Sequence, residues 1–475
     1  MPSSVNVTIR MYKVGELGDC FFLRFQSGAK QSHVLIDCGS FRNSDKSIKR
    51  MNEIADDISA ELKGSPLNVV AGTHQHNDHL SGFVHAEEKF KAMDIEQVWL
   101  SWLDNPNDQD AVKIGKEYNN YLANLRSISK NLGTIEGFDS NKTAKATKSS
   151  VDAILQFYGV NDSALGLNAK EKFPPDLPAE AVKVLKKLGS GKPKYLAPGQ
   201  VFNLPGMASN TVKVYVLGPP KNEKLLKDAS PNSKETYDHG LAVTNAQAEK
   251  MLLALKNLSP GNANLEEEQP YPFNEPYFES KNIDGLMDRY NKASDKWRTI
   301  DNDWLKQAER LALWLDSYTN NSSLVLAFEL VKAEKVLLFV GDAQTGNWNS
   351  WKTIDWKGMP AGFNWISLLE KTVLYKVGHH CSHNATLVEG LEAMVHEELV
   401  AMIPVDVSDG NITKENGWKM PAQNLYARLI EKTHSRILRM DKGIVDKNKI
   451  ASKKAWNKLA KPKDKTLYVE YEVRG

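Results

Sequence analysis

The sequence predicts an α/β fold, because strand patterns and helical patterns alternate along most of the chain. Apolar and polar residues alternate over residues 5–11, and strand-like runs follow at 21–25 and 34–37, so a sheet begins at once. Apolar residues then recur at helical spacing from Ser44 to Leu62, before a Gly-Ser-Pro stop. This pattern predicts a helix that crosses over to a buried strand at residues 67–71.

Composition limits the class of protein. The chain has 475 residues and a formal net charge of +2, so no chain-wide field attracts nucleic acid or a membrane surface. No run of about 18 apolar residues and no apolar signal segment is present, and we expect a cytoplasmic protein that does not bind a membrane. Cys20, Cys38 and Cys381 are too widely spaced for a disulfide framework, and we expect the first two to be buried.

Three histidines and an acid follow the strand at 67–71 within six positions. His74 and His76 lie in a short loop that leaves the strand, and Asp78 and His79 lie one turn further on. The first pair can therefore meet at one point and the second pair at another, which predicts two metal ions. Imidazole and carboxylate groups suit zinc, manganese or iron.

Other candidate ligands also lie at strand ends. The strand pattern at 336–340 stops at Gly341-Asp342, and the pattern at 373–377 stops at Gly378-His379-His380. A two-layer fold gathers its site where strands end on one rim of a sheet. Asp37, at the end of a third strand, is either an acid that orients a metal-bound histidine or a turn former.

The run His-Gln-His-Asn-Asp-His resembles the HxHxDH signature of the metallo-β-lactamase fold superfamily. Among its members, the order of motifs is most similar to the hydrolase domain of bacterial DNA-uptake competence channel proteins. The resemblance implies a four-layer αβ/βα sandwich with two helical insertions. Besides HxHxDH, the matching motifs lie at residues 18–20, 35–39, 217–220, 321–324, 341–343 and 376–380.

The predicted domain organisation interrupts one core twice. Residues 1–102 would form the first part of the hydrolase core, 196–220 would add core strands, and 320–475 would complete it. Residues 103–195 and 221–319 show mainly helical spacing of apolar residues joined by polar linkers, and we interpret them as two insertions. The insertions are candidates for binding a protein partner.

The resemblance also implies roles for individual residues. His74 and His76 would bind the first of two divalent ions, zinc or alternatively manganese. Asp78, His79 and His379 would bind the second ion, and Asp342 would bridge both. The hydroxide that the two ions generate would attack the substrate. The candidate catalytic residues are Asp78, His380 and Lys376: His380, or else His383, would protonate the leaving group, and Lys376 would contact phosphate or be solvated.

The chain departs from the family pattern at three positions. Many relatives supply a third imidazole to the first metal, and His239 is the candidate here, although it lies in an insertion. Cys381 stands where the relatives have glycine, and it is a soft ligand, an oxidisable thiol or merely tolerated. Met420 stands where they have histidine.

These observations predict a metal-dependent hydrolase, and most specifically a phosphodiesterase or nuclease whose substrate is DNA or RNA. A hydrolase of a small-molecule ester, lactone or cyclic nucleotide is the alternative enzyme, and a partner-binding protein with a residual metal site is the alternative without catalysis. Lysines crowd residues 442–465. Such a run is more often a solvated face than a surface for phosphate.

Overall fold

The computed structural model describes residues 4–133, 142–160, 176–228, 235–236, 292, 303–413, 417–446, 450–457 and 459–475. The chain divides into two compact units. Unit 1 comprises residues 1–115, 156–242 and 317–475, and unit 2 comprises residues 116–155 and 243–316. Both segments of unit 2 lie inside the ranges that the sequence predicts as insertions.

The described strands belong to unit 1 and form two eight-stranded sheets. In spatial order the first sheet contains β15 Lys463–Asp464, β16 Tyr468–Val473, β1 Asn6–Tyr12, β2 Cys20–Ser27, β3 Lys30–Cys38, β4 Leu67–Ala71, β5 Ile95–Ser101 and β6 Lys194–Leu196. The second contains β14 Gly443–Ile444, β13 Ile437–Arg439, β12 Val400–Ile403, β11 Thr372–Lys376, β10 Lys335–Phe339, β9 Val325–Leu330, β8 Val212–Gly218 and β7 Val201–Asn203.

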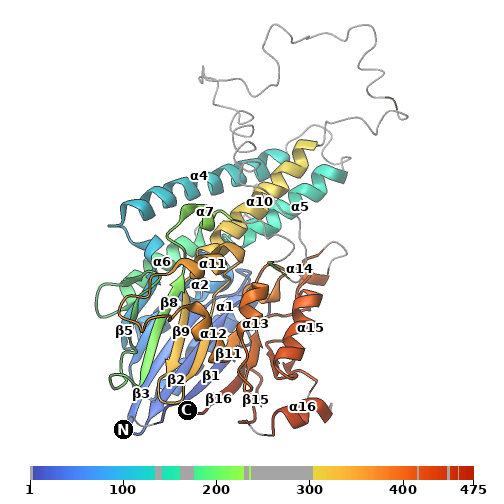
Figure 1. Cartoon of the computed structure of the whole chain (residues 1–475). Coiled ribbons are helices and arrows are strands. Elements are labelled where there is room, and N and C mark those ends of the chain that lie inside the picture. The colour runs from blue at the N-terminus through green and yellow to red at the C-terminus, as the bar shows by residue number, and fades with distance from the viewer. Residues whose placement is uncertain are drawn as a thin grey trace. The chain divides into compact units, whose positions relative to one another are not determined.

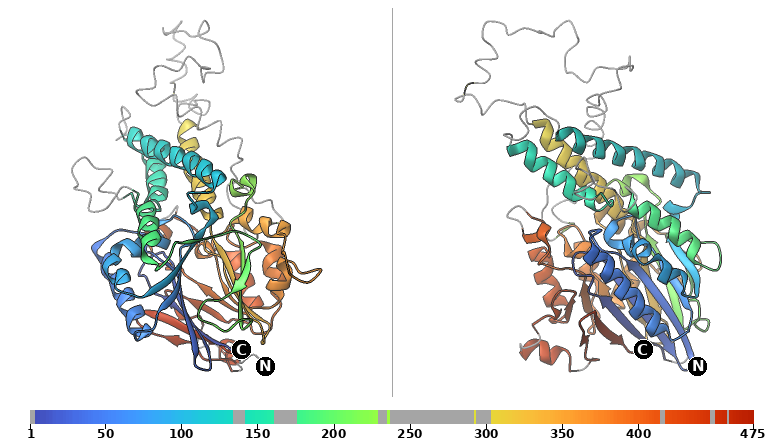
Figure 2. Two further views of the ribbon diagram at one scale, coloured as in Figure 1. Left: turned by 90° about the vertical axis from the view of Figure 1, so that its left-hand side faces the viewer. Right: turned by 180° about the vertical axis from the view of Figure 1, so that it is seen from behind.

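The two sheets pack face to face. The Phe21 and Phe339 rings meet with centroids 5.6 Å apart, and those of Phe25 and Phe328 are 5.5 Å apart. These side chains belong to one buried apolar cluster that draws on both sheets. Helices cover the outer faces, with α1, α2 and α6 beside the first sheet and α11 and α12 beside the second (Figures 1 and 2). The predicted α/β class, with two large sheets and flanking helices, is confirmed.

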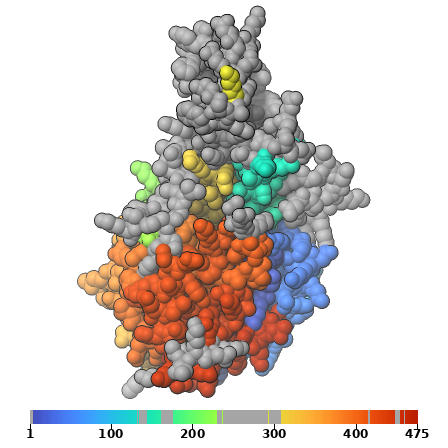
Figure 3. Space-filling model, turned by 90° about the vertical axis from the view of Figure 1, so that its right-hand side faces the viewer, coloured from blue at the N-terminus to red at the C-terminus, as the bar shows by residue number. Residues whose placement is uncertain are grey.

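The described helices of unit 1 are α1 Asp45–Leu62, α2 Asn77–His85, α3 Glu87–Lys91, α6 Leu177–Leu188, α7 Glu223–Leu226, α11 Thr345–Ser350, α12 Trp365–Glu370, α13 Val388–Ala393, α14 Gly410–Thr413, α15 Gln423–Lys432 and α16 Ile450–Ala455, with short 3₁₀ turns η1 Trp102–Asp104, η4 Trp351–Thr353 and η5 His379–Cys381. Elements from the C-terminal part of the chain, coloured orange and red in Figure 3, cover much of one face of unit 1.

Unit 2 contains most of the residues of helices α4 Gln109–Leu132, α5 Lys142–Gln156 and α10 Asp303–Asn321. The rings of Tyr121 on α4 and Trp314 on α10 meet edge to face at 5.3 Å. Within α5, Lys148 and Asp152 form an ion pair at 2.6 Å.

The crossover helix α1 forms where its apolar spacing predicts. The Ser44 hydroxyl accepts a hydrogen bond from the backbone N–H of Ser47 and caps its N-terminus. Met51, Ile54 and Ile58 lie on its buried face. The helix leads into β4, which pairs in parallel with both β3 and β5 and is wholly buried.

Two differences from the sequence expectation concern short elements. The strand β6, which pairs with β5, has its first two residues at the end of the predicted first insertion, because three residues are too few for a periodic signal. The composition of residues 83–93 predicts one helix, whereas the structure has two, and the first begins earlier, at Asn77. Residues 246–258 also have a helical pattern in the sequence, and they lie outside the described residues. Among the described helices, none has the length and apolar character needed to cross a membrane.

Candidate metal centre

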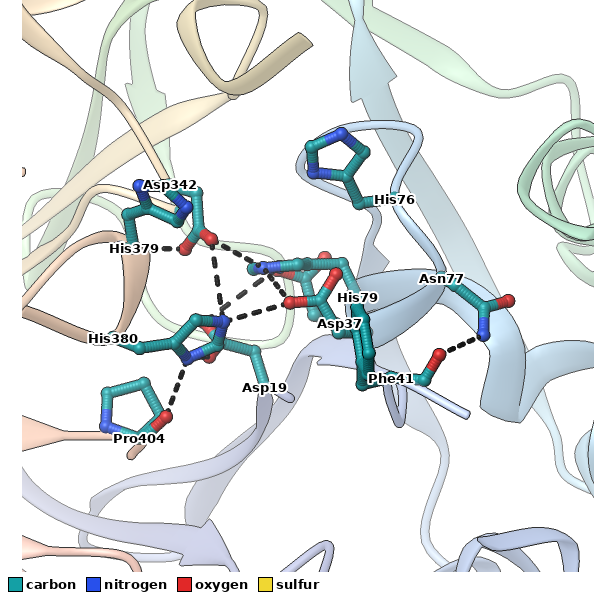
Figure 4. Close-up of polar contacts among 12 residues, drawn as sticks. Asp19, Asp37, Phe41, His76, Asn77, His79, Asp342, His379, His380 and Pro404 are labelled. Carbon is teal, nitrogen blue, oxygen red and sulfur yellow. Dashed lines mark hydrogen bonds and ion pairs between the residues drawn. The ribbon is translucent and has the colours of Figure 1, made fainter. Parts of the chain in front are cut away.

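The candidate site lies where four strands end. Asp37 is near the end of β3, and β4 leads to His74 and His76. On the second sheet, β10 leads to Asp342, and β11 leads to the turn that holds His380. In Figure 4 the side chains of Asp37, Asp342 and His380 converge around His79, as positions at strand ends predict, and His76 lies to one side.

Asp78, His79, Asp342 and His380 form a buried group whose ligand atoms all lie within 4.8 Å of one another. The Nε2 atom of His380 is 2.9 Å from Oδ2 of Asp78, and the Nε2 atom of His79 is 3.2 Å from Oδ2 of Asp342. Oδ1 of Asp78 is buried without a hydrogen-bond partner among the described residues, and Nε2 of His79 and Oδ2 of Asp342 are paired by charge and not by a well-aligned hydrogen bond. Such atoms are costly to bury, and a cation among them would satisfy all three.

His74 and His76 form a second point of convergence beside this group. Both are buried, and Nε2 of His74 is 3.1 Å from Nδ1 of His76. The hydroxyl oxygens of Thr73 and Ser323 lie 3.1 Å and 3.2 Å from Nδ1 of His74, on the opposite side of its ring. The two imidazoles therefore face one another while the hydroxyls fix the orientation of His74.

The first turn of α2 lies close to two loops of the first sheet, the turn before β2 and the loop after β3. The backbone N–H of Asp19 donates to the carbonyl of Asp78 at 2.9 Å. A Cβ atom at Gly39 would lie only 2.4 Å from the Asp78 carbonyl carbon, so a side chain there would push the two segments apart. Asp78 itself occupies the first turn of α2, where the helix dipole favours an acid.

Asp37 makes the contact expected of an acid that orients a ligand. The ring N–H at Nδ1 of His79 donates to Oδ2 of Asp37 at 2.7 Å. Asp37 also accepts hydrogen bonds from the backbone and the hydroxyl of Thr73, at 2.8 and 2.7 Å. This arrangement turns Nε2 of His79 toward Asp342, as orientation of a metal-binding imidazole requires.

Lys376 is buried beside the same group. Its ammonium pairs with Asp19, lies 3.1 Å from Oδ1 of Asp342 and donates to the Gly341 carbonyl at 2.6 Å. The backbone N–H of His379 also donates to Oδ1 of Asp342, at 2.9 Å. One oxygen of Asp342 is thus held by cationic and backbone donors, and the other faces the histidines. The expectation of a solvated Lys376 is wrong, because paired acids stabilise its charge inside the protein.

His380, and not its neighbour His379, joins the four-residue group. The Nδ1 atom of His380 is 2.6 Å from the Pro404 carbonyl, which directs Nε2 toward Asp78. The Nδ1 atom of His379 instead lies 3.0 Å from the amide nitrogen of Gln344 and 2.8 Å from the hydroxyl of Ser382. Residues 379–381 all have positive φ, and this tight turn sends the two imidazoles in different directions.

The charges of the group favour a cation at its centre. Burial would lower the pKa of His380, but Asp342 and Asp78 outweigh it and raise that pKa to about 8. Burial likewise opposes the raised pKa of His79, which Asp342 and other acids place well above the ordinary value. By contrast, burial lowers the pKa of His76 to about 3. The carboxylates therefore attract positive charge to Nε2 of His79 and His380, while His76 stays a neutral potential ligand.

Asp19 is the site residue to which the sequence assigned no role. Burial raises its pKa to about 6, although Lys376 acts in the opposite direction. It lies near Asp37 and His79, and these three also have ligand atoms within 4.8 Å of one another. The sequence feature that could have identified Asp19 as a site residue is its place in a Gly-Asp-Cys turn before β2.

The remaining candidates lie apart from this group or outside the described residues. His239 is outside the described residues. Cys381 is buried, as are Cys20 and Cys38, which confirms the expectation for the latter two. His383 is half-buried. In the lysine-rich segment, Lys463 pairs with Glu470 at 2.6 Å, so part of its charge is balanced.

Comparison of the chain with models of known protein families and with curated proteins found no match. The functional conclusion therefore depends on the residues and geometry of this site.

Proposed function

We propose that the chain is a metal-dependent hydrolase with a metallo-β-lactamase fold, and that its substrate is a phosphodiester in nucleic acid. The observation that carries the proposal is the buried group Asp78, His79, Asp342 and His380, in which one oxygen of Asp78 has no hydrogen-bond partner among the residues that the structure describes. Two eight-stranded sheets with helices outside, and a site at their strand ends, support the fold assignment.

The residues present fit two divalent ions. His74 and His76 would hold one ion, and Asp78, His79 and His380 would hold the other. Oδ2 of Asp342 faces Nε2 of His79 at 3.2 Å, and we assign Asp342 the bridging role between the two sets. His380 takes the ligand role that the family resemblance assigned to His379. A set of imidazoles and carboxylates suits zinc, with manganese as the alternative.

Bound ions would polarise a phosphoryl oxygen and lower the pKa of a water molecule. Neighbouring groups of the protein hold the proposed ligands in the orientation that this chemistry requires. Asp37 orients His79, the Pro404 carbonyl orients His380, and Lys376 with the His379 N–H directs one oxygen of Asp342 into the site. Because all of these groups are buried, little reorganisation is needed when charge develops on the substrate.

His379 is the remaining imidazole at the edge of the site, and it is 7% exposed. Its Nδ1 atom is engaged by Gln344, and its Nε2 atom lies 3.5 Å from the amide nitrogen of Asn320. Burial lowers its pKa to about 4, so the ring would be neutral and would form a hydrogen bond with a substrate group. We assign it this binding role, in place of His380, which the sequence suggested as the acid.

The test is cleavage of labelled single-stranded DNA, duplex DNA and RNA by chelator-stripped protein, before and after addition of zinc or manganese. The matched control is Asp342→Asn, which keeps the size of the side chain and removes its charge. Cleavage that returns with metal in the wild type only is the expected result. Intact substrates in every wild-type sample that has bound metal would overturn the nuclease proposal.

A further inference from the structure

A stack of aromatic rings extends from the metal centre toward the surface of unit 1. The ring of Phe157 lies 5.0 Å from that of His76, and Trp418 stacks on Phe157 with centroids 5.2 Å apart and ring planes 22° apart. Phe41 meets Phe157 edge to face at 4.6 Å and Trp418 at 5.6 Å. The stack thus begins at a candidate ligand and ends at Trp418.

Backbone hydrogen bonds fix both sides of this stack to the centre. The Asn77 N–H, next to Asp78, donates to the Phe157 carbonyl at 2.6 Å. On the other side, the Ala422 N–H donates to the Cys381 carbonyl at 2.8 Å. The segment that carries Trp418 is therefore tied by a backbone hydrogen bond to the turn that holds His380.

Exposure distinguishes Trp418 from the other members of the stack. His76, Phe157 and Phe41 are buried, with 1%, 2% and 0% of their surfaces exposed, whereas Trp418 is only half-buried. Packing requires the inner face of the indole, which Phe157 covers. The rest of the indole is not needed for that packing and is partly exposed. Because the His76–Phe157 and Phe157–Trp418 centroid distances are 5.0 Å and 5.2 Å, the indole lies within about 10 Å of the His76 imidazole.

We propose that Trp418 is a stacking platform for an unpaired base of the strand whose phosphodiester is cleaved. This inference rests on the proposed function and specifies its substrate class. Every base offers a π face, so the platform tolerates any sequence. A base within a duplex is covered by its neighbours and must first leave the stack. The enzyme therefore prefers single-stranded nucleic acid.

The experiment compares two labelled oligomers of equal length, one of single-stranded DNA and one in which abasic tetrahydrofuran units replace every nucleotide. Affinity is measured by fluorescence anisotropy and cleavage by gel, for wild type, Trp418→Ala and Trp418→Phe. The matched control is Phe363→Ala, which truncates another half-buried aromatic residue, stacked on Tyr215 at 5.6 Å. Far-ultraviolet circular dichroism checks that each variant is folded.

Trp418→Ala should weaken binding of the base-bearing oligomer by about tenfold and leave binding of the abasic oligomer unchanged. Trp418→Phe should retain most of the affinity because it keeps a π face, and Phe363→Ala should resemble the wild type. Equal losses on both oligomers, or no loss on either, would overturn the stacking role while leaving the nuclease proposal intact. A wild type that cleaves duplex DNA but neither binds nor cleaves the single-stranded oligomer would overturn the preference for unpaired bases alone, and a metal-loaded wild type that cleaves no single-stranded DNA, duplex DNA or RNA would overturn both proposals.

Discussion

The Nε2 atom of His380 lies 2.9 Å from Oδ2 of Asp78, although 302 positions separate the two residues in the chain. The contact joins the first turn of α2, beside the first sheet, to the turn after β11 in the second sheet. The group Asp78, His79, Asp342 and His380 is thus assembled by the packing of the two sheets, and either sheet by itself would lack two of its four residues.

The first prediction separates the two neighbouring histidines. His380→Ala removes an imidazole that faces Asp78 and Asp342, so the variant should lose one of the two proposed ions. His379→Ala is its matched control in the same turn, and it should retain both ions. Inductively coupled plasma mass spectrometry of zinc-loaded protein measures the number of zinc ions bound per chain. Full zinc content in His380→Ala together with a loss in His379→Ala would reverse the assignment.

The second prediction concerns the buried ammonium of Lys376. Lys376→Met leaves Asp19 and Asp342 without their cation, and it should destabilise metal-free protein by about 3–5 kcal/mol. Added zinc should restore part of this loss, since it supplies positive charge beside Asp342. Lys371→Met, at a half-buried lysine that pairs with Glu329 at 3.1 Å, should respond little to zinc. Thermal unfolding with and without zinc measures both, and an equal zinc response in the two variants would contradict the role.

The third prediction concerns the orientation of His79. Asp37→Asn keeps the shape of the side chain but weakens the hydrogen bond at Nδ1 of His79, and zinc affinity should fall by about 10- to 100-fold. Competition with a chromogenic chelator measures the affinity. Asp57→Asn, which alters an ion pair with Arg10 away from the site, is the control. Unchanged zinc affinity in Asp37→Asn would show that Asp37 forms the turn but does not orient His79 for metal binding.

The fourth prediction links stability to pH through Glu470. Burial would raise the pKa of Glu470, but its bonds to Lys463 and Arg10 lower it below the ordinary value of 4.5. A lowered pKa stabilises the folded state above that ordinary value, and this contribution is lost as pH falls through the folded pKa. Glu470→Gln should therefore cost about 1–3 kcal/mol at pH 7 and much less in acid.

Denaturant unfolding at pH 7 and near pH 4 tests this dependence. Glu472→Gln, on the same strand and paired with the exposed Arg474, should change stability little at either pH. A deficit in Glu470→Gln that is the same at both values would show that the ion pairs do not provide the stability.

The sequence predicted the parts of the fold that have a long or regular pattern. Alternation identified β1, and the spacing of Met51, Ile54 and Ile58 identified α1 and its buried face. Clustering of His74, His76, Asp78 and His79 after a buried strand was enough to locate the site. These signals are local, so a single sequence contains them.

Contacts between distant segments could not be predicted in the same way. Lys376 lies in an apolar strand, and its buried charge is explained by the approach of Asp19 from the first sheet and of Asp342 from the end of β10. The choice between His379 and His380 depends on three successive positive φ angles, which no composition or spacing indicates. Trp418 was not distinguished from other tryptophans because its proximity to Phe157 arises from tertiary packing.

The central claim is tested most directly by a crystal structure of zinc-loaded protein with an anomalous difference map recorded at the zinc absorption edge. We expect one peak among Asp78, His79, Asp342 and His380 and a second beside His74 and His76, with Asp342 between the peaks. A map with no peak at these residues, from protein that contains zinc, would contradict the claim that this buried group is a metal centre.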